Sequence, residues 1–177
     1  MTRMHMRSVF ARILGQHAAD ILSQMTNSKP GVIEVGRLIP QGTSYELAAG
    51  IDFTGALAEE GSAQGGRLIC GAVKKADIEP LLAAVVQRLG LNRDILDTPN
   101  GPQDLLNEFL NIIIGLTGAD WAVHGYDMDF SPPRVLNSLS LPTPESGDQA
   151  FYIKVFTEAG PQVDIAVVFC DREAPFI

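Results

Sequence analysis

A predicted helix between residues 103 and 117 carries one narrow polar stripe on an otherwise apolar surface. On a helical wheel at about 100° per residue, the polar and glycine positions fall within roughly 100° of one another. These positions are Asp104, Asn107, Glu108, Asn111 and Gly115. A surface helix normally has a broader polar face with lysine or arginine, and this segment has neither. The stripe could therefore offer carboxylate and amide groups to a docking partner.

Glu108 and Asn111 are the two residues of the stripe whose types could do chemistry. They are three positions apart, so their side chains meet on the helix surface, and Gly115 lies one turn further on with no side chain to block an approaching surface. A carboxamide donates and accepts hydrogen bonds and can orient a water molecule, which supplies much of the rate when a phosphoryl group is transferred through a loose transition state. The alternative is an ordinary solvated helix edge, and the E-x-x-N spacing alone does not decide between them.

Two longer motifs resemble a known family. The run NEFLNIIIG at 107–115 is similar to the E-L-x-N-I-I-x-G signature of the CheX chemotaxis phosphatases, which belong with CheC and FliY in one superfamily. Downstream, the run DFSPPRV at 129–135 is similar to the SPP segment that joins two strands in that family. The chain therefore resembles CheX in two linked motifs that occur in the right order.

The resemblance implies a phosphatase that removes the aspartyl phosphate of a CheY-like response regulator, in chemotaxis or another two-component pathway. It gives Asn111 the task of positioning the attacking water and Glu108 that of pairing with a lysine of the receiver domain. We expect Asp104, Asn107 and Gly115 to shape the docking surface. The receiver would bring its own Mg²⁺, so the resemblance implies no cofactor or metal in this chain. It also implies a homodimer formed along sheet edges.

The chain departs from the family pattern directly after Gly115, where the run LTGA at 116–119 replaces a G-x-A-K-like continuation. This departure leaves open a noncatalytic CheX-like module that binds a receiver or another signalling protein as a scaffold. A purely structural dimerisation domain is a third alternative. The first and second predicted helices contain no second E-x-x-N, so the pattern of one active helix per chain matches CheX better than CheC.

Other candidate sites have simpler explanations. The three histidines are far apart, and none has a neighbour at metal-binding spacing; they are His5, His17 and His124. We expect His17 to pack on the first helix. Both cysteines lie in apolar, strand-like runs, where unpaired thiols behave as buried apolar groups; they are Cys70 and Cys170. No nucleophile or nucleotide-binding motif occurs.

Two aspartates and one tryptophan near the third helix also have structural explanations. Asp127 and Asp129 alternate with apolar residues along a predicted strand, which places both on one face. We interpret that face as solvated rather than as an acid pair or a cation site. Trp121 follows the third predicted helix, and we expect it to anchor the core.

The apolar pattern predicts three helices and several strands. Apolar residues at helical spacing cover 8–25, 78–89 and 103–117, and Gly90 is placed to end the second helix. Strand-like runs, two of them joined as a hairpin by a turn at 40–42, occupy 32–39, 45–53, 67–74, 121–130, 135–139, 151–157 and 163–169. We expect loops at 55–66 and 141–149 and a linker at 94–101. This order predicts an α+β fold with a largely antiparallel sheet and helices packed on one face.

Length and charge narrow the class of protein. A chain of 177 residues can bury one sizeable core, so we expect a single domain over 1–177. The net charge of −8 disfavours binding to a nucleic acid. No apolar run reaches the ~18 residues that a membrane span requires, and the opening residues lack the pattern of a secretory signal. We therefore expect a cytoplasmic protein.

Overall fold

The computed structural model describes residues 3–29, 34–36, 44–57, 63–136, 149–158, 160 and 162–170. The helices are α1 (Arg3–Thr26), α2 (Lys75–Leu89) and α3 (Gly101–Val123), with a short 3₁₀ helix η1 (Arg93–Asp97). The strands are β1 (Glu34–Gly36), β2 (Leu47–Leu57), β3 (Ala63–Ala72), β4 (Tyr126–Phe130), β5 (Arg134–Val135), β6 (Gln149–Phe156) and β7 (Gln162–Cys170).

The strands form one sheet in the order β1-β6-β7-β3-β2-β4, in which β5 also pairs with β2. All of the described strand pairs are antiparallel. β4 and β5 pair with two successive stretches of β2, because β4 lies opposite 53–57 and β5 lies opposite 49–50. The predicted antiparallel sheet is confirmed.

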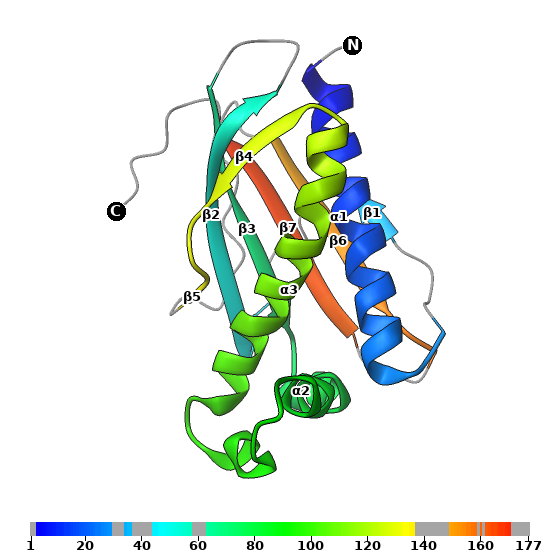
Figure 1. The fold of residues 1–177 in the computed structure, drawn as a ribbon, viewed down its shortest axis with the longest axis vertical. Coiled ribbons are helices and arrows are strands. Elements are labelled where there is room, and N and C mark those ends of the chain that lie inside the picture. Colours follow the sequence, from blue (N-terminus) through cyan, green and yellow to red (C-terminus); the bar gives the residue numbers. More distant parts are fainter. Residues whose placement is uncertain are drawn as a thin grey trace.

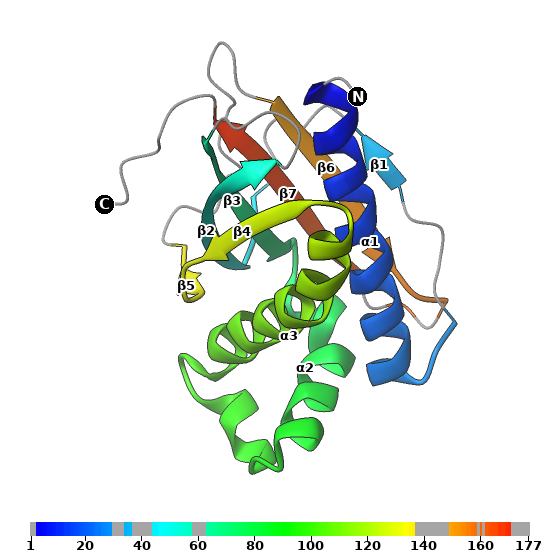
Figure 2. The same ribbon diagram turned by 45° about the horizontal axis from the view of Figure 1, so that its top comes forward.

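The helices lie on one face of this sheet. In Figure 1, α1 and α3 run side by side across the sheet, and α2 lies near the end of the sheet where α3 begins. In the turned view of Figure 2, β6 passes behind α1, and α3 and α2 lie below the strands. The predicted α+β fold, with helices packed on one face, is therefore confirmed.

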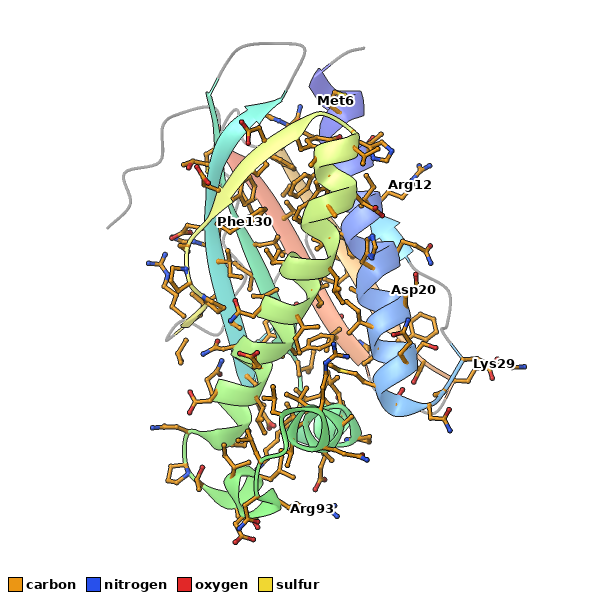
Figure 3. The ribbon with its side chains drawn as sticks, viewed as in Figure 1. Met6, Arg12, Asp20, Lys29, Arg93 and Phe130 are labelled. Atoms are coloured by element: carbon orange, nitrogen blue, oxygen red, sulfur yellow. The ribbon has the colours of Figure 1, made fainter. Side chains whose placement is uncertain are left out.

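An aromatic cluster fills the core between the helices and the sheet. The ring of Phe10 on α1 stacks on Trp121 of α3 at 4.1 Å between centroids and meets Phe169 of β7 edge to face at 5.4 Å. Figure 3 labels Phe130 on β4, and its ring stacks on Trp121 at 5.3 Å. Trp121 is only 1% exposed, so its predicted place in the core is confirmed.

Trp121 belongs to the last turn of α3 rather than to a strand, so α3 is longer than predicted. One turn earlier, Thr117 is buried, and its Oγ1 donates a 2.6 Å hydrogen bond to the backbone oxygen of Ile113. The helix continues through Gly118 because Thr117 and Trp121 both face the core. The predicted strand over 121–130 is therefore shorter, since β4 starts at residue 126.

The predicted hairpin between 32–39 and 45–53 is wrong. β1 pairs with β6, with Val35 opposite Ile153, whereas β2 pairs with β3 along its length. Strands adjacent in sequence usually pair, but here the partner of β1 comes from more than a hundred residues away. The predicted turn at 40–42 lies outside the described residues.

The predicted loop at 55–66 is strand at 55–57 and 63–66, because β2 and β3 extend into it from both sides, and residues 58–62 lie outside the described part. Gly55 and Gly66 mark places where chain segments approach closely rather than turns. A Cβ at Gly55 would overlap the backbone oxygen of Asp127, and a Cβ at Gly66 would overlap the ring of Phe53.

The remaining predicted elements agree more closely. α1 begins five residues earlier than predicted, and α2 ends at Gly90, whose φ of 64° is the expected left-handed cap. The predicted linker at 94–101 contains most of η1. β6 and β7 cover the two predicted C-terminal strands. Residues 137–148, which include most of the predicted strand at 135–139 and loop at 141–149, lie outside the described part.

Candidate functional site: a polar stripe on α3

α3 forms because its start and its apolar pattern both favour a helix. Pro102 lies in the first turn, where its missing N–H would have had no partner, and Asp104 in the same turn interacts favourably with the helix dipole. One side of the helix is buried in the core through Leu105, Leu106, Phe109, Leu110 and Ile113. The predicted stripe lies on the other side.

The structure brings the five predicted site residues onto that outward side. Asp104, Asn111 and Gly115 are exposed, and Asn107 and Glu108 are half-buried. A Cβ at Gly115 would meet no atom within 4 Å, so the surface there is open. The stripe is therefore accessible to a docking partner.

Glu108 and Asn111 touch at the limit of a hydrogen bond. The Nδ2 of Asn111 donates to Oε2 of Glu108 at 3.5 Å in an exposed setting, a length at which a neutral donor gains little. The amide is thus held weakly and can turn toward an incoming group. The pair can present one carboxylate and one carboxamide to a partner.

Asn107 has an unusual place beside this pair. Its Oδ1 is buried and lacks a hydrogen-bond partner in the described part of the chain. A buried acceptor without a partner is costly, and a partner that docks on the surface of α3 does not reach an atom that the chain itself covers.

Gln103 fastens the start of α3 to the edge of β2. Its Nε2 donates to the backbone oxygen of Ala48 at 2.8 Å, and its Oε1 accepts from the backbone N–H of Ala48 at 3.3 Å. The side-chain amide therefore pairs with β2 as a strand residue would. Gln103 is not among the predicted site residues, because no local signal in the sequence reveals a partner 55 residues away.

The SPP segment, the second predicted motif, does not meet the polar stripe. Ser131 forms two hydrogen bonds with the backbone of Asp52. The Ser131 N–H donates to the backbone oxygen of Asp52 at 2.9 Å, and the Ser131 Oγ accepts from the backbone N–H of Asp52 at 3.0 Å. The Asp52 carboxylate binds Arg67 at 2.6 Å and also Arg134. Asp52 alternates with the core residues of β2, so this cluster lies on the face of the sheet opposite α3. Its role here is to hold strands together.

Two histidines lie near the end of α3. Nε2 of His17 lies 2.7 Å from Oδ2 of Asp120, which joins α1 to α3, and Nδ1 of His124 lies 2.8 Å from the backbone oxygen of Asp120. The prediction that His17 packs on α1 missed this cross-helix partner. Among the residues that the structure describes, no three potential ligands gather as a metal site would require.

The other candidates keep the structural roles predicted for them. Asp127 and Asp129 are both exposed on β4. Neither Cys70 nor Cys170 forms a disulfide within the described part of the chain; Cys70 is buried, and burial raises the pKa of its thiol well above the usual value. No described helix is long and apolar enough to cross a membrane.

Comparison with known proteins reveals the fold. No family model matches the chain, and neither does any curated protein sequence. Solved structures do match. A CheC-like superfamily protein from Shewanella sp. PV-4 is 18% identical, with a TM-score of 0.62 over 91% of this chain and 97% of that one. The chemotaxis protein CheX from Desulfovibrio desulfuricans is also 18% identical, with a TM-score of 0.57 over the same shares.

A third structure contains two proteins. It is the complex of CheX with CheY, BeF₃ and Mg²⁺ from Borrelia burgdorferi, whose matching chain is 16% identical, with a TM-score of 0.57 over 90% of this chain and 97% of that one. The chain thus has the CheC/CheX-like fold, as its two motifs predicted.

Proposed function

We propose that this protein is a phosphatase for the aspartyl phosphate of a CheY-like receiver domain, with Asn111 and Glu108 as its working pair. The observation that carries the proposal is the position of these two side chains, which lie adjacent and accessible on the outward side of α3. The CheX-like fold supports it, and so does the relative from Borrelia burgdorferi that was solved in a complex with CheY.

In the proposed reaction, the carboxamide of Asn111 orients a water molecule in line with the phosphorus. The water oxygen forms a new bond to phosphorus as the bond to the aspartyl oxygen breaks, and the water protons end on inorganic phosphate and solvent. Little covalent chemistry is needed, because the transition state is loose and rate comes from positioning. Glu108 pairs with a cation of the receiver and so fixes the angle at which the amide enters. The receiver supplies the Mg²⁺.

The test is the decay of a phosphorylated CheY-like receiver in the presence of Mg²⁺. We expect the wild-type chain to accelerate decay and Asn111→Ala to lower kcat by about 100-fold, as loss of one positioned hydrogen-bonding group does elsewhere. Gln87→Ala removes an exposed helical amide from α2 and serves as the matched control. An Asn111→Ala variant as active as the control would contradict the assigned role.

A second candidate is a noncatalytic module that binds the receiver without changing the lifetime of its phosphate. The departure from the family pattern after Gly115 favours it. In this case the receiver binds with a measurable affinity, but its phosphate decays at the same rate with or without the protein.

We also propose that the protein is a cytoplasmic homodimer that pairs along a sheet edge. The described sheet ends at β1 on one side and β4 on the other. Exposed Asp127 and Asp129 on β4 would oppose their copies in a second chain, and like charges facing each other disfavour pairing. The β1 edge is therefore the better candidate for pairing. A mass of one chain in light scattering would contradict the proposed dimer.

A further inference from the structure

The start of α3 contains Asn100 followed by Gly101, which is the only Asn–Gly pair in the chain. Asparagine is a thermolabile residue, and it is most labile before glycine, where no side chain shields the next backbone nitrogen from the carboxamide. Asn100 is exposed, and its side chain forms no capping hydrogen bond with the helix. The carboxamide carbon is therefore accessible to attack.

The reaction that this pair can undergo is deamidation. The backbone nitrogen of Gly101, after losing its proton to hydroxide, forms a bond to Cγ of Asn100. The bond from Cγ to the side-chain nitrogen breaks, and that nitrogen leaves as ammonia with a proton from water. Water then opens the resulting succinimide ring at one of its two carbonyls, which leaves aspartate or isoaspartate. The net reaction consumes one water and releases one ammonia, with no other reactant.

The fold holds the attacking nitrogen in a hydrogen bond. The N–H of Gly101 donates to Oγ1 of Thr98 at 3.0 Å. The Thr98 hydroxyl in turn donates to the backbone oxygen of Ile95 at 2.8 Å. A backbone N–H that donates a hydrogen bond gives up its proton only when the bond opens. Thr98 therefore protects the pair from the first step of the reaction.

The backbone of Asn100 also keeps the two reacting atoms apart. Its ψ of −15° is helical, and its carbonyl oxygen accepts from the N–H of Asp104 at 2.9 Å. Ring closure requires Cβ of Asn100 and the nitrogen of Gly101 to lie on the same side of the Cα–C bond, and the helical ψ rotates them away from each other. A rotation about this bond would break the hydrogen bonds to both Asp104 and Thr98.

Gly101 has a packing role that explains why such a reactive pair stands here. A Cβ at Gly101 would overlap the backbone oxygen of Ile95 in η1 and also Oγ1 of Thr98. A residue with a side chain would slow deamidation but would push α3 away from η1. The close approach at the start of α3 therefore requires the glycine that makes Asn100 labile.

We propose that Asn100 is a deamidation site that the folded chain keeps closed through Thr98, and that reacts when the first turn of α3 opens. Helix ends open locally at a much smaller free-energy cost than global unfolding, so the site reacts in molecules that are otherwise folded. The proposal does not depend on the phosphatase reaction.

The two products affect the start of α3 differently. Aspartate adds a negative charge at the N-cap, where the helix dipole favours it, so this product keeps the fold. Isoaspartate adds one carbon to the main chain and shifts Gly101 from its place against Ile95. We expect the isoaspartyl form to unfold at a lower urea concentration than the wild type.

The experiment follows amide loss at each asparagine by peptide mapping and mass spectrometry. The wild type, Thr98→Ala, Thr98→Ser and Thr26→Ala are incubated at pH 8 and 37 °C, with a second sample of wild type unfolded in urea. Thr98→Ser keeps the hydroxyl. Thr26→Ala removes a hydroxyl that donates to the backbone oxygen of Leu22, and so matches Thr98→Ala away from the site. Asn27, exposed and followed by Ser28, is the internal reference.

We expect deamidation of Asn100 in the folded wild type to be at least about tenfold slower than in urea. Thr98→Ala should accelerate it about fivefold, the effect of losing one hydrogen bond from the closed state. Thr98→Ser and Thr26→Ala should stay close to the wild-type rate, and the rate at Asn27 should not respond to either change of Thr98. Thermal unfolding of each variant checks that the fold is retained.

Three outcomes would overturn the proposal. The first is a wild type that loses the amide of Asn100 as fast in buffer as in urea, because the fold then gives no protection. The second is an equal rate for Thr98→Ala and Thr98→Ser, because the hydroxyl then has no part in it. The third is an equal acceleration by Thr26→Ala, which would assign the reaction to global unfolding.

Discussion

Nε2 of His17 and Oδ2 of Asp120 lie 2.7 Å apart, although 103 residues separate them in the chain. The contact joins the middle of α1 to the end of α3, nine residues beyond Asn111. It fixes how the two helices lie against each other near the end of α3.

The contribution of this pair to stability should be small. The side chains are 27% and 56% exposed, and exposed ion pairs contribute about 0.2–1 kcal/mol. A double-mutant cycle with His17→Gln and Asp120→Asn, followed by urea unfolding, should give a coupling free energy in that range. A coupling above about 2 kcal/mol would mean that the pair holds the helices together more strongly than its exposure allows.

Removal of the Gln103 side chain should cost more. Gln103→Ala leaves the N–H of Ala48 without this partner, while the C=O of Ala48 keeps the N–H of Leu136, and we expect a loss of about 1–3 kcal/mol in the free energy of unfolding for the one unsatisfied donor. Gln103→Glu is the sharper comparison, because it keeps the acceptor but loses the donor. A Gln103→Ala variant as stable as the wild type would contradict the anchoring role.

Docking should depend on salt through Glu108. Charge attraction between exposed groups is screened over about 10 Å at 0.1 M ionic strength, so receiver binding should weaken as salt rises from 20 mM to 500 mM. Glu108→Gln, which keeps the shape and removes the charge, should bind more weakly at low salt and respond less to added salt. Glu79→Gln on α2, an exposed carboxylate outside the stripe, is the control and should retain the salt dependence of the wild type.

Cys70 should be inert toward thiol reagents in the folded protein. Burial raises the pKa of its thiol, and only the thiolate reacts. In a Cys170→Ala variant at pH 8, Ellman's reagent should therefore modify Cys70 only as fast as the chain unfolds. Fast modification under native conditions would contradict its burial.

Stability should fall at alkaline pH for a related reason. Burial raises the pKa of Tyr126 to about 12 and also raises the pKa values of Cys70 and Tyr45. These groups keep their protons in the folded state at a pH where the unfolded chain loses them, so unfolding releases protons and the free energy of unfolding decreases as pH rises. The decrease should begin near pH 8.5, where an unfolded thiol ionises, and steepen above about pH 10 for the tyrosines. Urea unfolding between pH 7 and 11 measures it.

The parts of the fold that the sequence predicted are those with local causes. The period of the apolar residues predicted α1, α2 and α3, and strand-like apolar runs predicted β6 and β7. Gly90 predicted the end of α2, because the left-handed cap that ends a helix depends on the backbone conformation of that one residue. The polar stripe on α3 was predicted for the same reason, since its five residues share one helix.

The parts that it did not predict depend on distant partners. The pairing of β1 with β6 and the contacts of Gln103 with Ala48 and of His17 with Asp120 join residues between 55 and about 120 positions apart. Gly55 and Gly66 have the composition of a loop, but their function is to let strands approach, which only the assembled sheet reveals.

α3 is attached to β2 at both ends. Gln103 holds the start of the helix to Ala48, and the chain that leaves its end enters β4, where Tyr126 pairs with Leu57. Twenty helical residues and nine strand residues each span about 30 Å. The helix and the strand therefore match in length, and α3 crosses the sheet with both of its ends attached. Asn111 lies near the middle of this helix. A partner that docks there meets a backbone already ordered by folding, and association need not supply the entropy of arranging it.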